Sequence, residues 1–205
     1  MGSLEYFLPF NSKILFMKKI NLLFILLAGI LNTAHLSAQS QEDMKAFMNY
    51  MTPGPIQQMM AKSVGAWTGT VTMWMQPGAP PTTSTMETNN EMILGGRYLQ
   101  GLNKGSMMGM PFEGIGITGY DNAKKVFVSS WVDNMGTGII YMEGNWDENA
   151  KTINMSGKST DPITGKDIPT REVWKFVDDT HQVLEMYFTE KGQEFKGMEL
   201  AYSKK

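Results

Sequence analysis

The chain has 205 residues, of which 42% are hydrophobic and 19% are charged, and its formal net charge at pH 7 is −2. That length suits one domain with a sizeable core, and the near-neutral charge gives no reason to expect a nucleic-acid or anionic-membrane partner. The absence of cysteine excludes disulfides, thiolate metal sites and a cysteine nucleophile. With only two histidines in the chain, metal and histidine acid–base chemistry are sharply restricted.

The beginning of the chain has the pattern of a secretory signal. Met17-Lys18-Lys19 supplies positive charge, residues 20–31 are mostly apolar, and a stretch ending at Ala38 resembles a cleavage site. The apolar run is shorter than the roughly 20 residues that a membrane-spanning helix needs. We therefore expect residues 1–38 to be an N-terminal extension plus a signal peptide, and the mature protein to be secreted or periplasmic without a membrane span.

Two short helices are expected in residues 39–64. The apolar positions are Met44, Phe47, Met48 and Met51 in the first and Ile56, Met59, Met60 and Val64 in the second. This spacing gives each helix one apolar stripe, and Pro55 suits the first position of the second helix. We expect both stripes to pack on the outside of the following domain; the alternative is a helical lid over its mouth.

Residues 65–205 have the pattern of an all-β domain. In the stretch from Gly65 to Met75, Trp67, Gly69 and Val71 alternate with threonines, which indicates a strand because successive side chains of a strand point to opposite faces. Turn signals then recur about every dozen residues. The expected later strands are Thr82–Leu94, Arg97–Lys104, Pro111–Tyr120, Val126–Asp133, Ile139–Trp146, Lys151–Gly157, Thr170–Val177, Gln182–Glu190 and Glu194–Tyr202.

The short connections predict an antiparallel up-and-down β-barrel of about ten strands, because parallel crossovers need a dozen or more residues. Trp67 at the start of the first strand is expected to close one end of the barrel. A barrel of this size is wider than side chains fill, so an internal cavity is expected. The expected inward set of the second strand, Ser84, Met86, Thr88, Asn90 and Met92, is half polar, which fits a small-molecule site.

Several short motifs follow one another in a specific order. They are Gly65-x-Trp67, Ile93-Leu94-Gly95-Gly96-Arg97-Tyr98-Leu99, Pro111-Phe112-x-Gly114-x-Gly116 with Gly119-Tyr120-Asp121, and Trp131-x-Asp133-x-Met135-Gly136-Thr137. The pattern resembles the calycin superfamily of lipocalins and fatty-acid-binding proteins, and more closely the bacterial domain of unknown function 1579 family. The resemblance extends from about Pro53 to Tyr202 and implies a lipocalin-like barrel without an assigned activity.

Arg97 and Asp133 are the candidate charged residues of the cavity. If both point inward they should pair, because a lone buried charge is costly. The pair would either close the barrel as a structural ion pair or let Arg97 hold an anionic head group such as a carboxylate.

Trp131, Tyr120, Tyr141 and Phe112 are candidates for an aromatic wall that contacts a ligand, with Met86 beside them on the inward face. The alternative is that they are ordinary core residues. His181 lies in a polar turn, Asp178-Asp179-Thr180-His181, and is expected to be solvated rather than to bind haem, so no cofactor is expected.

The sequence contains none of the common hydrolase, phosphate-binding or zinc-protease motifs. We therefore predict a non-catalytic binding protein for a small, largely hydrophobic or amphiphilic molecule. One alternative is a hydrolase or isomerase that uses carboxylates such as Glu185 and Asp133 in the same cavity. Another is an envelope interaction module whose barrel is filled.

Overall fold

The structure, a computed structural model, describes residues 39–190 and 192–205. The predicted signal peptide lies outside these residues. Residues 39–51 are helical, as predicted, and Met44, Phe47 and Met48 on this helix are exposed. The chain divides into two units, the second of which, Tyr50–Lys205, contains all the strands. None of the helices in the described part of the chain is long and apolar enough to span a membrane.

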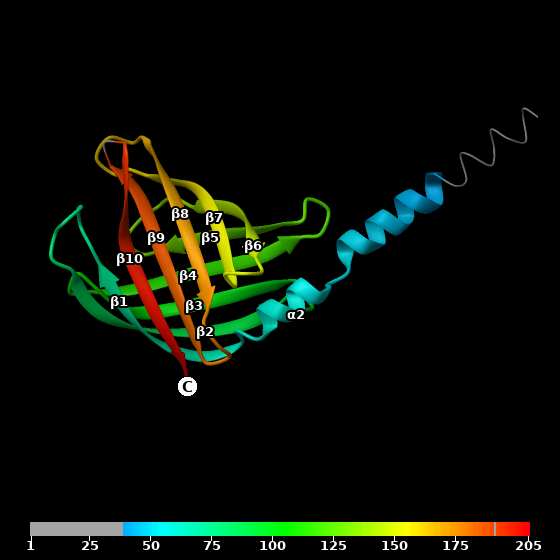
Figure 1. The fold of residues 1–205 in the computed structure, drawn as a ribbon, viewed down its shortest axis with the longest axis horizontal. Helices are drawn as coiled ribbons and strands as arrows, with labels where there is room; N and C mark the ends of the chain where they lie inside the picture. The colour runs from blue at the N-terminus through cyan, green and yellow to red at the C-terminus, as the bar shows by residue number, and fades with distance from the viewer. Residues whose placement is uncertain (1–38, 191) are drawn as a thin grey trace, which may run out of the picture. The chain divides into compact units, whose positions relative to one another are not determined.

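The second unit is a closed barrel of ten strands, each antiparallel to its neighbours (Figure 1). A short helix, α2 (Pro55–Ala61), precedes them. The strands are β1 (Gly65–Met73), β2 (Thr82–Ile93), β3 (Tyr98–Met107), β4 (Met110–Asp121), β5 (Val126–Asp133), β6 (Ile140–Asp147), β7 (Thr152–Thr160), β8 (Asp167–Phe176), β9 (His181–Glu190) and β10 (Gln193–Lys204). Each strand pairs with the next along the chain, and β10 returns to β1. The predicted fold class is confirmed.

Side chains alternate between the lumen and the outer surface along the strands, with a register shift in β10 between Lys196 and Met198. In β1, Trp67 and Val71 are buried while Thr68 and Thr70 are exposed. The pairing carries this alternation around the barrel, since Val71 lies opposite Leu200 of β10 and Ser84 of β2. The inward set predicted for β2 therefore faces the lumen.

Glycines stand where strands come too close for a side chain. A Cβ atom at Gly144 would lie 1.8 Å from the carbonyl oxygen of Asn154, and one at Gly157 would lie 2.2 Å from that of Tyr141. Both contacts are far shorter than van der Waals distance, so β6 and β7 approach each other this closely only with glycine at these positions.

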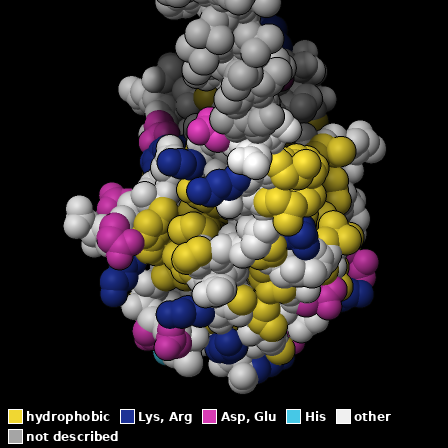
Figure 2. Space-filling model, turned by 90° about the vertical axis from the view of Figure 1, so that its right-hand side faces the viewer, with side chains coloured by type: hydrophobic (Ala, Val, Ile, Leu, Met, Phe, Trp, Pro, Cys, Tyr) yellow, Lys and Arg dark blue, Asp and Glu magenta, His cyan; other side chains and the backbone are white. Residues whose placement is uncertain are grey.

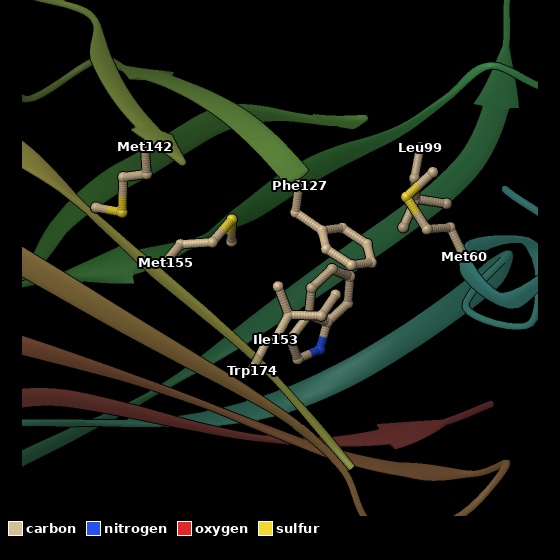
Figure 3. Close-up of a cluster of buried hydrophobic side chains, with 7 residues drawn as sticks. All are labelled: Met60, Leu99, Phe127, Met142, Ile153, Met155 and Trp174. Atoms are coloured by element: carbon tan, nitrogen blue, oxygen red, sulfur yellow. The ribbon is translucent and has the colours of Figure 1, made fainter. Parts of the chain in front are cut away.

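Helix α2 closes one end of the barrel. Met60 of this helix is fully buried and packs with Leu99, Phe127, Ile153 and Trp174 in a cluster that also contains Met142 and Met155 (Figure 3). The expectation that this helix packs on the outside of the barrel is therefore wrong for α2. Its apolar stripe is inserted into the barrel end, where a side chain gains more burial than it would on the outer wall.

Gln57 fixes the start of this helix to the barrel. Its Oε1 accepts a hydrogen bond from the backbone N–H of Gly54 at 2.8 Å, and its Nε2 donates to the backbone oxygen of Tyr120 at 3.3 Å. The side chain is only 5% exposed, so these bonds satisfy an amide that would be costly to bury alone.

A second apolar cluster lies towards the opposite end of the lumen. It contains Val71, Met86, Phe112 and Leu200, with Trp131 and Met198 packed against it. The two clusters leave a polar zone of the lumen between them, which holds the candidate site.

The outer surface is mixed in character. Figure 2 shows hydrophobic side chains on the face that it presents, with Lys, Arg, Asp and Glu side chains between them. The exposed hydrophobic residues include Ile115, Val132, Ile139 and Tyr141.

Candidate functional site

The zone between the two apolar clusters contains a cavity of about 110 Å³. Polar side chains from several strands line it, among them Thr88, Asn103, Glu172 and Gln182. Indole rings of Trp67, Trp131 and Trp174 complete much of the wall. The cavity wall therefore mixes polar side chains with aromatic rings and leucines, unlike the two apolar clusters that bound it.

Glu172 contributes a carboxyl group to this wall. It lies on β8 between Met155 of β7 and Met186 of β9 in the strand register, so its nearest cross-strand neighbours are apolar. Its carboxyl makes neither a hydrogen bond nor an ion pair with the described residues. It lines the cavity together with the other polar side chains of the wall. Burial raises the pKa of this carboxyl from its ordinary value of 4.5 to about 7.

Tyr202 of β10 lies on the same wall and interacts with Glu172. Burial raises the pKa of its phenol, a hydrogen bond with Thr88 opposes that rise, and the negative charge of Glu172 adds to it. Thr88 in turn donates to Oδ1 of Asn103 at 2.6 Å. Tyr202, Thr88 and Asn103 thus form one connected polar strip across β10, β2 and β3.

Each side-chain amide of the wall donates one hydrogen bond to a protein oxygen. Asn103 Nδ2 donates to the backbone oxygen of Gly101 at 3.2 Å, and Asn90 Nδ2 donates to that of Ser63 at 3.1 Å. Gln182 Nε2 donates to Ser63 Oγ at 2.9 Å. These bonds fix the amides against the wall.

The indole N–H groups are also occupied. Trp67 donates to the backbone oxygen of Ser63 at 2.8 Å, Trp174 to Gln182 Oε1 at 3.1 Å, and Trp131 to Asp133 Oδ2 at 2.7 Å. The tryptophans therefore contribute ring surface to the cavity and no further donor.

Trp131 separates the cavity from a second hollow at the rim of the barrel. This outer hollow has a volume of about 510 Å³ and is lined by Trp131, Asp133 and the turn that joins β5 to β6. The Trp131 ring is stacked on Phe112 with centroids 6.2 Å apart, and it lies over Gly114 and Gly116. Of the residues that the structure describes, Trp131 is the one that lines both hollows.

Comparison with known proteins identifies the family. The family model described as "Protein of unknown function (DUF1579)" matches residues 52–204. The chain belongs to the DUF1579 family. Among solved structures, the crystal structure of Rv2717c from M. tuberculosis is similar with a TM-score of 0.57 and 13% sequence identity, over 75% of this chain and 99% of that one. At this identity the likeness concerns the fold alone. No curated protein matches the chain.

Three of the predicted aromatic residues face the lumen of this DUF1579 barrel. Trp131 and Phe112 pack at the rim, and Tyr120 contacts Phe127 with ring centroids 5.1 Å apart. Met86, also predicted, is 2% exposed in the cluster with Phe112. Of these four residues, Trp131 borders the cavity itself.

Tyr141 does not belong to the aromatic wall. It is 52% exposed on the outer face of β6, and its hydroxyl donates to Glu143 Oε1 at 2.6 Å. The strand phase explains the difference, because Met142, the next residue, occupies the inward position.

Arg97 and Asp133 lie at opposite ends of the barrel and do not pair. Arg97 follows the β2–β3 turn, where its guanidinium donates to the backbone oxygens of Met51 and Leu94 at 2.7 and 3.1 Å. Asp133 ends β5 and accepts bonds from the Trp131 indole and from the backbone N–H of Met135. An anionic head group held by Arg97 would therefore lie outside the cavity.

The carboxylates suggested for catalysis are also separated. Glu185 is on the outer face of β9, where it forms ion pairs with Lys175 at 2.8 Å and Lys196 at 3.4 Å. His181 is exposed and bonded to Asp178. In the described part of the chain no three His, Asp or Glu side chains are grouped so that they could hold a metal ion.

Glu172 and Tyr202 are the site residues that sequence reasoning missed. A signal for Glu172 was present, because it lies two residues before Trp174 and four before Phe176, on the aromatic face of β8. A carboxyl in phase with two aromatic rings indicates an inward charge.

Proposed function

We propose that this protein is exported and binds a small, largely hydrophobic organic molecule in the lumen of its barrel. The observation that carries the proposal is the cavity, whose wall joins three indole rings to a carboxyl without a protein partner among the described residues. Binding sites of small molecules combine an apolar wall with a few placed polar groups in this way.

The size of the cavity limits the ligand. An apolar cavity of roughly 150 Å³ is enough for benzene, so about 110 Å³ suits a molecule of similar or smaller size. A long acyl chain is too large for it. The proposed ligand is therefore a compact molecule.

The experiment follows the indole N–H resonances by NMR while n-butanol is added to the purified, isotope-labelled protein. The resonances of Trp67, Trp131 and Trp174 should shift together and saturate. Trp74 is the internal reference, because its ring packs against Lys196, which forms its ion pairs on the outer surface.

A matched pair of variants tests whether n-butanol binds in the cavity. Thr118→Leu adds bulk to the cavity wall, whereas Thr70→Leu makes the same change on the exposed face of β1. Saturable shifts should be lost in Thr118→Leu and kept in Thr70→Leu. Saturable binding that survives in both variants, or no saturation in the parent protein, would contradict the proposal.

A second candidate function is proton transfer, as in an isomerase. It is favoured by the position of Glu172, whose raised pKa of about 7 suits a general base, beside the hydroxyl of Tyr202. Its test is the exchange of the hydrogens next to the carbonyl of butanone for deuterium. Exchange that is accelerated by the parent protein but not by Glu172→Gln would support catalysis, and equal rates would exclude this role for Glu172.

A further inference from the structure

The described wall of the cavity carries an acidic side chain and no basic one. Glu172 lines the cavity, and Asp133 stands at the rim beside Trp131. Among the described residues, the side chains lining the cavity include no lysine or arginine. The cation on the inward face of β10, Lys204, lies at the α2 end, where its Nζ is 5.4 Å from the centre of the Trp67 ring and donates to the backbone oxygen of Lys62.

The neutral part of the wall favours a positive charge as well. Indole and phenol rings attract cations through their negative faces, and the N–H groups of the three cavity tryptophans are occupied by protein acceptors. The rings of Trp67, Trp131 and Trp174 thus offer the cavity mainly their π surface.

The same wall is poorly suited to an anion. The side-chain amides of Asn90, Asn103 and Gln182 each already donate to a protein oxygen. An anionic ligand would also meet the charge of Glu172 at short range, which is costly in a site of low dielectric.

We propose that the ligand is a small organic cation, an alkylammonium with a compact apolar group, whose charge is neutralised by Glu172 and whose carbons contact the tryptophan rings. This inference rests on the proposed binding function and names the chemical class of its ligand. Tyr202, which interacts with Glu172, and the Thr88–Asn103 pair on the same cavity wall supply oxygen atoms for the ammonium hydrogens.

The charge state of Glu172 determines how binding should depend on pH. Met155 and Met186 lie opposite Glu172 on the neighbouring strands and do not titrate, and the phenol of Tyr202 stays neutral. The other charged side chains described along the lumen are Asp133 at the rim and Lys204 at the α2 end. A cation binds the ionised carboxylate, so its affinity should fall as pH decreases below the pKa of about 7.

The experiment compares three probes of nearly equal size: n-butylamine, n-butanol and butyrate. Binding of each is measured from the indole resonances at about pH 8 and about pH 6, where n-butylamine stays a cation and Glu172 changes its charge. We expect n-butylamine to bind about tenfold or more tightly than n-butanol at the higher pH, as for a charge-assisted contact. That advantage should shrink at the lower pH, and butyrate should bind most weakly.

Two variants test whether the preference for n-butylamine depends on the charge of Glu172. Glu172→Gln removes the charge and keeps the shape, so the preference for the amine over the alcohol should disappear. Glu113→Gln makes the same change on the outer surface, where Glu113 pairs with Lys104, and should preserve the preference. The pH series on the parent protein gives the same information if Glu172→Gln does not fold.

The outcomes separate the two proposals. If n-butanol or butyrate binds at least as well as n-butylamine at the higher pH, the cation inference is wrong and the binding function stands. If none of the three probes gives saturable shifts, both fail. An amine preference that persists in Glu172→Gln would also overturn the role of this carboxyl.

Discussion

The indole nitrogen of Trp131 donates a hydrogen bond to Asp133 Oδ2 at 2.7 Å, and this bond holds the ring between the cavity and the outer hollow. The other carboxylate oxygen of Asp133 accepts the backbone N–H of Met135 at 2.9 Å. One side chain therefore links the position of the ring to the turn that follows β5. Movement of that turn would release the ring from its place over the cavity.

We predict that Asp133→Ala lowers the free energy of unfolding by about 1.5 to 3 kcal/mol, the usual contribution of hydrogen bonds to a charged group. It should also shift the indole N–H resonance of Trp131, which loses its acceptor. Chemical denaturation and NMR provide the measurements. Asp121→Ala is the control, because Asp121 caps its own turn through Ala123 and Lys124 and contacts no indole N–H. Equal resonance shifts in both variants would contradict this role of Asp133.

The glycines beneath Trp131 should differ in their tolerance of a methyl group. A Cβ atom at Gly114 would lie 2.4 Å from Trp131 Cζ2, whereas one at Gly116 would lie 3.3 Å from Cε3. We expect Gly114→Ala to destabilise the protein by about 1 to 3 kcal/mol, as overpacked interiors do, and Gly116→Ala to cost less. Gly138→Ala, with nothing within 4 Å of the added carbon, is the neutral reference. We expect the denaturation midpoint to be lowest for Gly114→Ala, higher for Gly116→Ala and highest for Gly138→Ala. Another order would show that the Trp131 ring moves aside easily.

The stability of the protein should decrease as pH rises through neutrality. Because the pKa of Glu172 is raised from 4.5 to about 7, the folded state holds this proton more tightly than the unfolded state does. The Glu172 contribution to the free energy of unfolding should therefore fall by about 3 kcal/mol between pH 4.5 and pH 8.

Denaturation of the parent protein and of Glu172→Gln across this range measures the effect. The variant should lack the decline, while Glu113→Gln should retain it. Groups with a lowered pKa, such as Asp178 at about 2, lose their contribution at lower pH and do not cancel the trend. An identical pH dependence in parent and Glu172→Gln would mean that Glu172 is already hydrated or paired.

We predict that expression in a bacterium with an export pathway yields a chain that begins at Gln39. N-terminal sequencing of the extracytoplasmic fraction tests this directly. Ala38→Leu should block processing, because the cleavage site requires a small residue, and Gln39→Leu is the neighbouring control. Recovery of the intact N-terminus from the cytoplasm alone would contradict the proposed export.

The fold could be predicted because the strands of a barrel have one buried face and one exposed face, so apolar and polar residues alternate along the sequence. Val126–Asp133 was predicted with its observed bounds, and the inward set around Met86 was assigned correctly. The resemblance of the sequence motifs to the DUF1579 family is confirmed by the family match over residues 52–204.

The candidate site was predicted less well. To place a residue in the site, one must know both the face of its strand on which it lies and the end of the barrel at which it lies. Arg97 and Asp133 were expected to pair if both pointed inward. Turns alternate between the two ends of an up-and-down barrel, however, which places the β2–β3 and β5–β6 turns at opposite ends. Tyr141 was assigned to the wrong face of its strand. Glu172 was missed because Arg171 and Lys175 beside it give the segment the composition of a solvated strand.

The seam of the barrel has a consequence for how the barrel folds. Trp67 lies opposite Lys204 and Met73 opposite Met198, so β1 must pair with β10 before the sheet can close. Contacts between the chain ends form late, because a long loop must be closed first. Until β10 is available, β1 lacks one of its two partner strands, and the sheet stays open along that edge.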